Sequence, residues 1–183
     1  LGCRRFVGAG TCFEYDTEVG RLDESSPTGP RHLYAACKLA LSTVLEQLQR
    51  DGVMSTVWPR LFFLYGPDEA ESRLVPAVTT ALLKGERVAV TPGAQLRDYL
   101  HVADAAAAIL KVAESDLTGT VNIGSGSEVS IRELVTTLAA IIERPELVDF
   151  GGRDYSPSDP MRVGADNTRL CQNTDWRPQY DLA

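Results

Sequence analysis

The spacing of apolar residues changes several times along the chain, and each spacing predicts a different kind of element. Leu41, Val44, Leu45 and Leu48 recur at intervals of three and four, which predicts a helix from about residue 31 to residue 50. Similar spacing, ended by glycine or polar residues, predicts further helices over 73–85, 101–115 and 130–144. Short apolar runs bounded by glycine or proline predict strands within 4–10, 55–67, 87–90, 97–100 and 119–126.

The order of these elements indicates the fold class. Strands alternate with helices, and this alternation is typical of an α/β fold, a parallel sheet flanked by helices. Ser130 and Glu133 have the spacing of a capping box at the start of the last predicted helix. Residues 15–30 and 151–170 are rich in turn-forming residues, so we expect irregular structure there.

Composition mainly excludes classes of partner and site. A formal net charge of -7 over 183 residues argues against nucleic acid and anionic membranes as main partners. No apolar run is long enough to span a membrane and no leader peptide is visible, so we expect a cytoplasmic protein. The four cysteines lack metal-ligand spacing and only two histidines are present, so we expect reduced thiols and no metal site.

One pair of residues has a spacing that suits proton transfer. Tyr34 precedes Lys38 by four residues on the predicted 31–50 helix, so the two side chains share a face. An ammonium beside a phenol favours the phenolate, which suits general acid–base catalysis near neutral pH. The same spacing also occurs by chance on helix surfaces, so the pair alone leaves both interpretations open.

Six segments, taken in order, extend the pattern over nearly the whole chain. They are RRFVGAGTCFEYD, YAACK, PRLFFLYGP, RDYLHVADAA, VNIGSGSEVSIREL and DPMRVGADNTRL with the later DWRP. In this order the sequence resembles the extended short-chain dehydrogenases/reductases, the nucleotide-sugar epimerase/dehydratase family. The resemblance implies a partial Rossmann-type parallel sheet with flanking helices and a smaller C-terminal substrate-binding part.

The resemblance also implies a role for several residues. Thr11 lies at the Ser/Thr position of the family and would polarise the substrate oxygen, while Tyr34 would be the acid/base. Lys38 would assist Tyr34 and hold the ribose next to the nicotinamide. Arg97 would meet the substrate pyrophosphate, for which a forked cation is suited; its alternative is a surface ion pair with Asp98.

Three other features resemble the family without implying chemistry. We expect Asn122 and the Gly124–Gly126 loop to be architectural rather than in contact with ligand. We expect His101 to form a hydrogen bond at the start of a helix rather than to act as a catalyst.

The cofactor implied is NAD or NADP, yet the glycine-rich loop that holds its pyrophosphate is missing. The segment GAGTCF at 8–13 lacks the third glycine, and GSGSEV at 124–129 has Val129 in that place, although Asp149 follows downstream. We therefore expect the chain to begin in the middle of the fold and to hold only the nicotinamide end of a cofactor. A fragment, a truncated product, or a missing portion on another chain would each explain this, and the activity of the isolated chain stays open.

Departures from the family narrow the expected chemistry. Cys12 and Phe13 stand where sugar 4,6-dehydratases carry an Asp-Glu pair, and phenylalanine cannot transfer a proton, so dehydration is disfavoured. Cys12 can serve as a weak acid or base, but a small buried thiol is the favoured interpretation. Phe63 replaces a frequent asparagine and suggests a more apolar sugar, such as a deoxysugar.

Together these inferences define the expected protein. Residues 1–66 would be the late portion of a dinucleotide-binding Rossmann domain, and residues 67–183 would be a substrate-binding region. Within the second range, residues 97–125 would return to the Rossmann domain. The expected activity is that of an epimerase or 4-ketoreductase acting on a nucleotide-linked sugar; the alternative is a non-catalytic, nucleotide-sugar-binding remnant without the cofactor half. We expect a homodimer formed through the 31–50 helix. The expected site comprises Thr11, Tyr34 and Lys38 as catalytic residues, Tyr34 and Lys38 at the cofactor, and Thr11, Cys12, Phe63 and Arg97 at the substrate.

Overall fold

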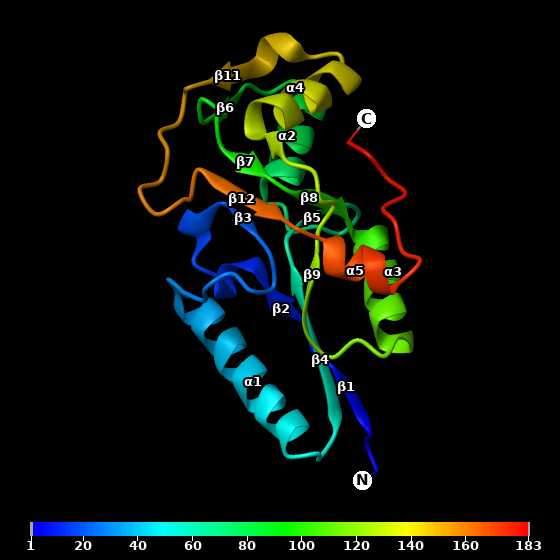
Figure 1. Ribbon diagram of the computed structural model, residues 1–183. Coiled ribbons are helices and arrows are strands. Elements are labelled where there is room, and N and C mark those ends of the chain that lie inside the picture. Colours follow the sequence, from blue (N-terminus) through cyan, green and yellow to red (C-terminus); the bar gives the residue numbers. More distant parts are fainter. Residues whose placement is uncertain (1, 183) are drawn as a thin grey trace.

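A parallel sheet of four strands lies at the centre of the computed structural model, which describes residues 2–182 (Figure 1). The middle strand, β4 (Ser55–Leu61), pairs on one side with β9 (Gly119–Ile123). On its other side it pairs with β1 (Arg5–Val7) and then with β2 (Gly10–Thr11). The parallel α/β fold expected from the alternation of elements is therefore confirmed.

A proline in the middle of β4 explains why β1 and β2 are separate strands. Gly8, which follows β1, donates its N–H to Val57 O, while Phe62, which follows β4, donates its N–H to Ile123 O of β9. Odd-numbered residues of β4 therefore bond toward β1 and β2, and even-numbered residues bond toward β9. Pro59 therefore faces the β1–β2 side, where it has no N–H to donate. The interruption at residues 8–9 lies opposite this missing donor, and β2 resumes the pairing with β4 in the same register as β1.

Two helices cover opposite faces of β4 (Figure 1). On one face, Thr56 donates its hydroxyl hydrogen to Leu45 O of α1 (Leu33–Arg50) at 3.2 Å. On the other face, the next residue, Val57, packs against α3 (Val102–Glu114). Successive strand residues point to opposite faces, so this single step along β4 places one helix on each side.

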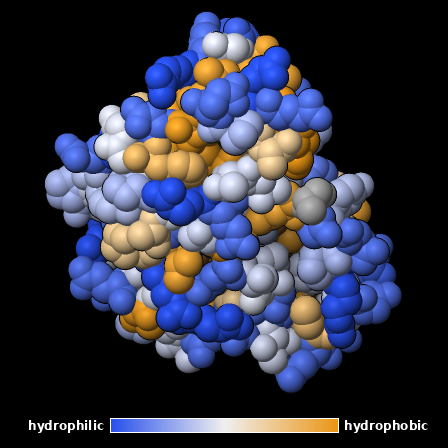
Figure 2. All heavy atoms as spheres, turned by 90° about the horizontal axis from the view of Figure 1, so that it is seen from above, coloured by the Kyte–Doolittle hydropathy of each residue, from blue (hydrophilic) through white to orange (hydrophobic). Residues whose placement is uncertain are grey.

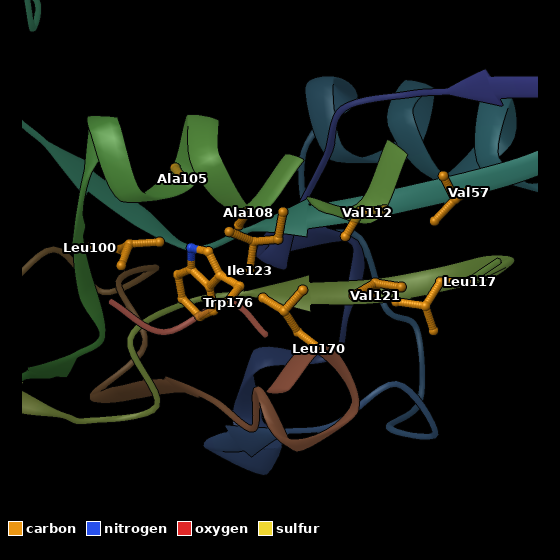
Figure 3. Packing of buried hydrophobic residues seen from close by; sticks show 10 residues of the cluster. All are labelled: Val57, Leu100, Ala105, Ala108, Val112, Leu117, Val121, Ile123, Leu170 and Trp176. Carbon is orange, nitrogen blue, oxygen red and sulfur yellow. The ribbon is translucent and has the colours of Figure 1, made fainter. Parts of the chain in front are cut away.

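The main core lies between α3, β4 and β9 (Figure 3). Trp176 reaches into it from the C-terminal segment and donates its indole N–H to Asp104 O at 3.0 Å. The Asp104 carboxylate in turn accepts the N–H groups of Gln179 and Tyr180 at 2.9 and 3.0 Å. The buried members are Val57, Leu100, Ala105, Ala108, Val112, Leu117, Val121, Ile123, Leu170 and Trp176.

A second set of short elements forms the upper region in Figure 1. The strand β12 (Arg162–Ala165) runs parallel to β3 (Arg21–Leu22) and β7 (Leu96–Arg97), and β10 (Val129–Ser130) pairs antiparallel with β7. Two further parallel pairs are β5 (Phe63–Tyr65) with β8 (Tyr99–His101) and β6 (Val88–Val90) with β11 (Val148–Phe150). The remaining elements are the helices α2 (Leu74–Leu83), α4 (Ile131–Ile141) and α5 (Thr168–Asn173), and the 3₁₀ turns η1 (Cys12–Glu14), η2 (Thr17–Val19) and η3 (Pro145–Leu147).

Three expectations about local structure need correction. Residues 15–30 and 151–170 are not simply irregular, because β3 and β12 pair with each other and α5 adds Leu170 to the core. The strand expected at 97–100 is divided at Asp98 into β7 and β8. Ser130 Oγ accepts the Glu133 N–H at 3.0 Å, which is half of the expected capping box; the complete box joins Thr11 and Glu14.

The surface above α2 and α4 is mainly hydrophilic, with apolar side chains in separate patches (Figure 2). Within residues 2–182, no helix is long and apolar enough to cross a membrane. The same residues contain no group of three or more His, Cys, Asp or Glu side chains arranged to hold a metal ion.

Candidate active site

A cavity of about 830 Å³ opens where β2 and β4 end and α1 begins. Ligands of parallel α/β sheets bind in this position, beyond the carboxyl ends of the strands. Among the residues that line the cavity are Thr11, His32, Tyr34, Phe63, Arg97 and Arg153. The cavity thus brings together four of the six expected site residues, Thr11, Tyr34, Phe63 and Arg97, although they are far apart in the chain; Cys12 and Lys38 do not line it.

Thr11 is the last residue of β2, and its backbone N–H forms a hydrogen bond with a buried carboxylate. Glu14 Oε1 accepts the Thr11 N–H at 2.8 Å, and Thr11 Oγ1 accepts the Phe13 N–H at 3.4 Å. The carboxylate of Glu14 is fully buried and pairs with Arg60 Nε at 2.8 Å, and it also accepts the indole N–H of Trp58 at 3.0 Å. This network fixes the position of Thr11 at the cavity.

Tyr34 and Lys38 lie close together on the first turns of α1. Tyr34 is 56% exposed and lines the cavity. Lys38 Nζ lies 5.7 Å from the centroid of the Tyr34 ring and donates to Ala9 O at 2.7 Å. The bond to Ala9, in the gap between β1 and β2, holds the ammonium group near the Tyr34 ring.

Arg97 is a buried cation of the cavity wall and not a surface residue, since only 3% of it is exposed. Its guanidinium donates to Asp159 Oδ1 at 2.7 Å and to Leu96 O at 2.8 Å. The guanidinium carbon lies 5.3 Å from the centroid of the Phe63 ring. The alternative of a surface ion pair with Asp98 is therefore wrong, because the partner is Asp159.

Asp98 instead holds the glycine loop that follows β9. Its carboxylate accepts the N–H groups of Ser125 at 2.6 Å and Gly126 at 2.9 Å, and burial raises the pKa of this carboxyl group. A Cβ atom on Gly124 would lie 2.5 Å from that of Ala165, so close packing requires glycine here. The loop donors are already used, which confirms that this loop is architectural.

Asn122 and His101 also have the roles expected of them. Asn122 accepts the hydroxyl hydrogen of Tyr15 at 2.8 Å and donates to Leu22 O at 2.9 Å, so it joins two segments of the core. His101 Nδ1 accepts the N–H of Ala103 at 3.2 Å and so caps the start of α3.

The two residues at the position of the dehydratase acid pair have different surroundings. Cys12 is buried in a core cluster and does not line the cavity; burial raises the pKa of its thiol to about 12. Phe13 does line the cavity and contacts Phe63 edge to face, with ring centroids 5.8 Å apart. Tyr99 continues this apolar wall, with its ring centroid 5.7 Å from that of Phe63.

The structure adds charged cavity residues that sequence reasoning missed. Arg73, directly before α2, and Arg153, between β11 and β12, place two more guanidinium groups in the wall. Glu69 contributes a carboxylate whose Oε2 is buried and has no hydrogen-bond partner among the described residues, and burial raises the pKa of Glu69. These three lie in loops, where residue type alone gave no signal.

Comparison with known proteins assigns the chain to a family. The profile of the NAD dependent epimerase/dehydratase family matches residues 1–124, and the chain belongs to this family. The resemblance to the extended short-chain dehydrogenases/reductases is thereby confirmed.

Relatives in this family have several different activities. UDP-glucose 4-epimerase of Rhizobium leguminosarum bv. trifolii is 27% identical over 204 residues, covering 100% of this chain and 62% of the relative. UDP-glucuronic acid decarboxylase 6 of Arabidopsis thaliana is 28% identical over 160 residues, covering 86% and 46%. The crystal structure of UDP-glucose 4-epimerase with UDP-glucose from Thermotoga maritima superposes with a TM-score of 0.90 at 23% identity, covering 99% and 60%. The chain spans about half of the length of these relatives, and their activities identify the family rather than one reaction.

Proposed function

We propose that this chain forms the catalytic and substrate-binding portion of an NAD(P)-dependent enzyme that acts on a nucleotide-linked sugar. The reaction proposed is hydride exchange at a carbonyl/hydroxyl carbon, as in an epimerase or a 4-ketoreductase. The observation that carries this proposal is one cavity lined by Thr11 and Tyr34 near one end of β2 and by Arg97 and Arg153 farther along its wall.

The reacting end of the cavity has groups suited to moving a proton at a sugar oxygen. Tyr34 would give or take this proton, and Thr11 would donate a hydrogen bond to the same oxygen. Lys38, fixed by Ala9 O, would stabilise the tyrosinate. Tyr34 and Lys38 also present the donors that suit the ribose next to a nicotinamide. When bound, NAD or NADP would accept and return the hydride.

The other groups of the cavity suit the two ends of a nucleotide sugar. The planar guanidinium groups of Arg97, Arg73 and Arg153 match the negative charge of a pyrophosphate and can bind its oxygen atoms in pairs. Phe13, Phe63 and Tyr99 form an apolar wall, which favours a sugar with few hydroxyl groups, such as a deoxysugar. Cys12 lies outside the lining, so we do not include it in the substrate contacts.

Domain division and assembly extend the same proposal. The pairing of β9 with β4 supports the return of residues 97–125 to the dinucleotide-binding domain of residues 1–66, with the rest of 67–183 forming the substrate-binding region. On α1, an apolar row points away from the sheet and would form a homodimer interface; it comprises Leu33, Cys37, Leu41 and Val44.

The test uses the complete gene product with UDP-glucose, dTDP-glucose, GDP-mannose and their 4-keto-6-deoxy derivatives, each with NAD, NADH or NADPH. Chromatography and mass spectrometry would show an epimerised or reduced nucleotide sugar, and absorbance at the reduced nicotinamide band would follow the cofactor. Calorimetry on the same ligands measures binding separately. Binding without turnover would favour the non-catalytic alternative, and absence of both would contradict the proposal.

A further inference from the structure

The two nitrogen atoms of His32 have different surroundings. His32 precedes α1 and caps it, because Nδ1 accepts the N–H of Ala35 at 3.2 Å. Nε2 lies on the opposite edge of the ring, and the side chain lines the cavity together with Thr11 and Tyr34. A capping residue with only a short oxygen, such as serine, would satisfy the helix but could not reach as far into the cavity.

The cap determines which nitrogen of His32 carries the hydrogen. An acceptor Nδ1 needs its lone pair, so in the neutral ring the hydrogen is on Nε2. The N–H donor of the neutral His32 ring is therefore Nε2, on a side chain that lines the cavity.

Neighbouring rings hold the imidazole at the reacting end of the cavity. Its ring centroid lies 5.4 Å from that of Phe13 in an edge-to-face contact. On the other side, the ring stacks against Tyr34 with centroids 6.1 Å apart and an interplanar angle of 24°. The donor is thus fixed between the expected acid/base and the apolar wall.

We propose that His32 is a substrate-binding residue that donates its Nε2–H to a hydroxyl or carbonyl oxygen of the sugar, next to the oxygen served by Tyr34. This inference rests on the proposed function, because it requires a nucleotide sugar in the cavity. In a wall made of Phe13 and Phe63, a single fixed donor would select sugars that keep an oxygen at that one position.

His101 provides a matched control within the same chain. It caps α3 in the same way, with Nδ1 accepting the N–H of Ala103 at 3.2 Å. Its ring packs on Tyr180 and Tyr65, with centroids 4.2 and 5.2 Å away, and it does not line the cavity. The two histidines thus share the capping role and differ in access to ligand.

Calorimetry on His32→Ser and His101→Ser separates the two roles, since serine keeps both helix caps. The ligands are UDP-glucose, dTDP-glucose and GDP-mannose, each compared with its nucleoside diphosphate. We expect His32→Ser to weaken binding of the nucleotide sugar about fivefold to tenfold, the value of one hydrogen bond, with the nucleoside diphosphate unchanged. His101→Ser should change neither. Equal affinities of wild type and His32→Ser for the nucleotide sugar would overturn the inference.

Nitrogen-15 NMR of labelled histidines gives a second measurement that does not depend on the folding of a variant. The wild-type signals should show the Nε2–H form for both residues, and the nucleotide sugar should shift the signals of His32 but not those of His101. Binding in calorimetry with no shift at His32 would contradict the inference and leave the proposed function standing. If neither these ligands nor their 4-keto-6-deoxy derivatives bind, the proposed function fails and the role of His32 fails with it.

Discussion

Glu14 accepts the backbone N–H of Thr11 at 2.8 Å while its carboxylate pairs with Arg60 at 2.8 Å. A charge that is fully buried thus links Thr11, which lines the cavity, to the central strand. Removing one partner of a buried ion pair leaves the other charge unpaired in the interior, which is more costly than the pair is worth. This network makes Thr11 sensitive to changes that do not touch the cavity.

Glu14→Gln should therefore destabilise the fold. We expect the free energy of unfolding to fall by about 3 kcal/mol or more, because Arg60 would remain buried and unpaired. Glu18→Gln is the matched control: Glu18 pairs with Arg31 at 2.7 Å, but both side chains are exposed and solvent screens the pair, so its effect should be much smaller. Urea denaturation followed by circular dichroism measures the free energy of unfolding of both variants. Equal losses in the two would show that burial of the ion pair does not determine its contribution to stability.

Tyr34→Phe should remove most of the activity of the complete gene product. General acid–base catalysis contributes about 10²–10⁴ in rate, so turnover should fall at least a hundredfold, with little change in substrate affinity. Tyr65→Phe removes a hydroxyl group away from the cavity, one that donates to Asp181 O, and should retain turnover. Steady-state kinetics on the two variants tests whether turnover depends on the Tyr34 hydroxyl. Near-normal turnover of Tyr34→Phe would exclude this residue from the mechanism.

Elimination of water from a nucleotide hexose should not occur. Phe13 lines the cavity without a proton to transfer, and the thiol of Cys12 is buried away from it with a pKa raised to about 12. A nucleotide-hexose that keeps its 6-hydroxyl should therefore leave the reaction without loss of water, and epimerisation would leave its mass unchanged. A 4-keto-6-deoxy product, lighter by one water and detected by mass spectrometry, would count against this expectation.

Cys12 also predicts a loss of stability at alkaline pH. Burial raises the pKa of this thiol from 9.0 to about 12 in the folded state, so above pH 9 only the unfolded chain loses the proton. The stabilising contribution is complete below pH 9 and is lost as the pH rises toward 12. The free energy of unfolding should therefore fall between pH 9 and 10, before Tyr15 and Tyr99, which have ordinary pKa values of 10.0, contribute in the same way. Cys12→Ala should fall less over this range in urea titrations.

The apolar row on α1 predicts a dimer that a single charge disrupts. Val44 is 56% exposed on α1 and Leu110 is 63% exposed on α3, so the two are matched in exposure but lie on different helices. Light scattering at micromolar concentration should show a dimer for the wild type and for Leu110→Glu, and a monomer for Val44→Glu. A monomeric wild type would contradict the proposed interface.

The sequence by itself determined the elements with local signals and the family. Helix α1 was predictable because apolar residues recur at helical spacing between Leu41 and Leu48. Strands β4 and β9 were predictable because both are short apolar runs bounded by turn residues. Tyr34 and Lys38 could be found because a helix brings residues four apart together whatever the rest of the chain does.

Only the tertiary structure decided which distant residues meet. The two-residue strands β3 and β7 exist because β12, more than 60 residues further along the chain, supplies their hydrogen-bond partners, and no local pattern records that pairing. The same holds for Arg97, whose partner is Asp159 and not its neighbour Asp98, because adjacent residues of an extended chain point to opposite sides. His32 was overlooked for a similar reason: the sequence shows that it precedes a helix, but only the tertiary structure packs its ring against Phe13 and Tyr34 and places the residue in the cavity wall.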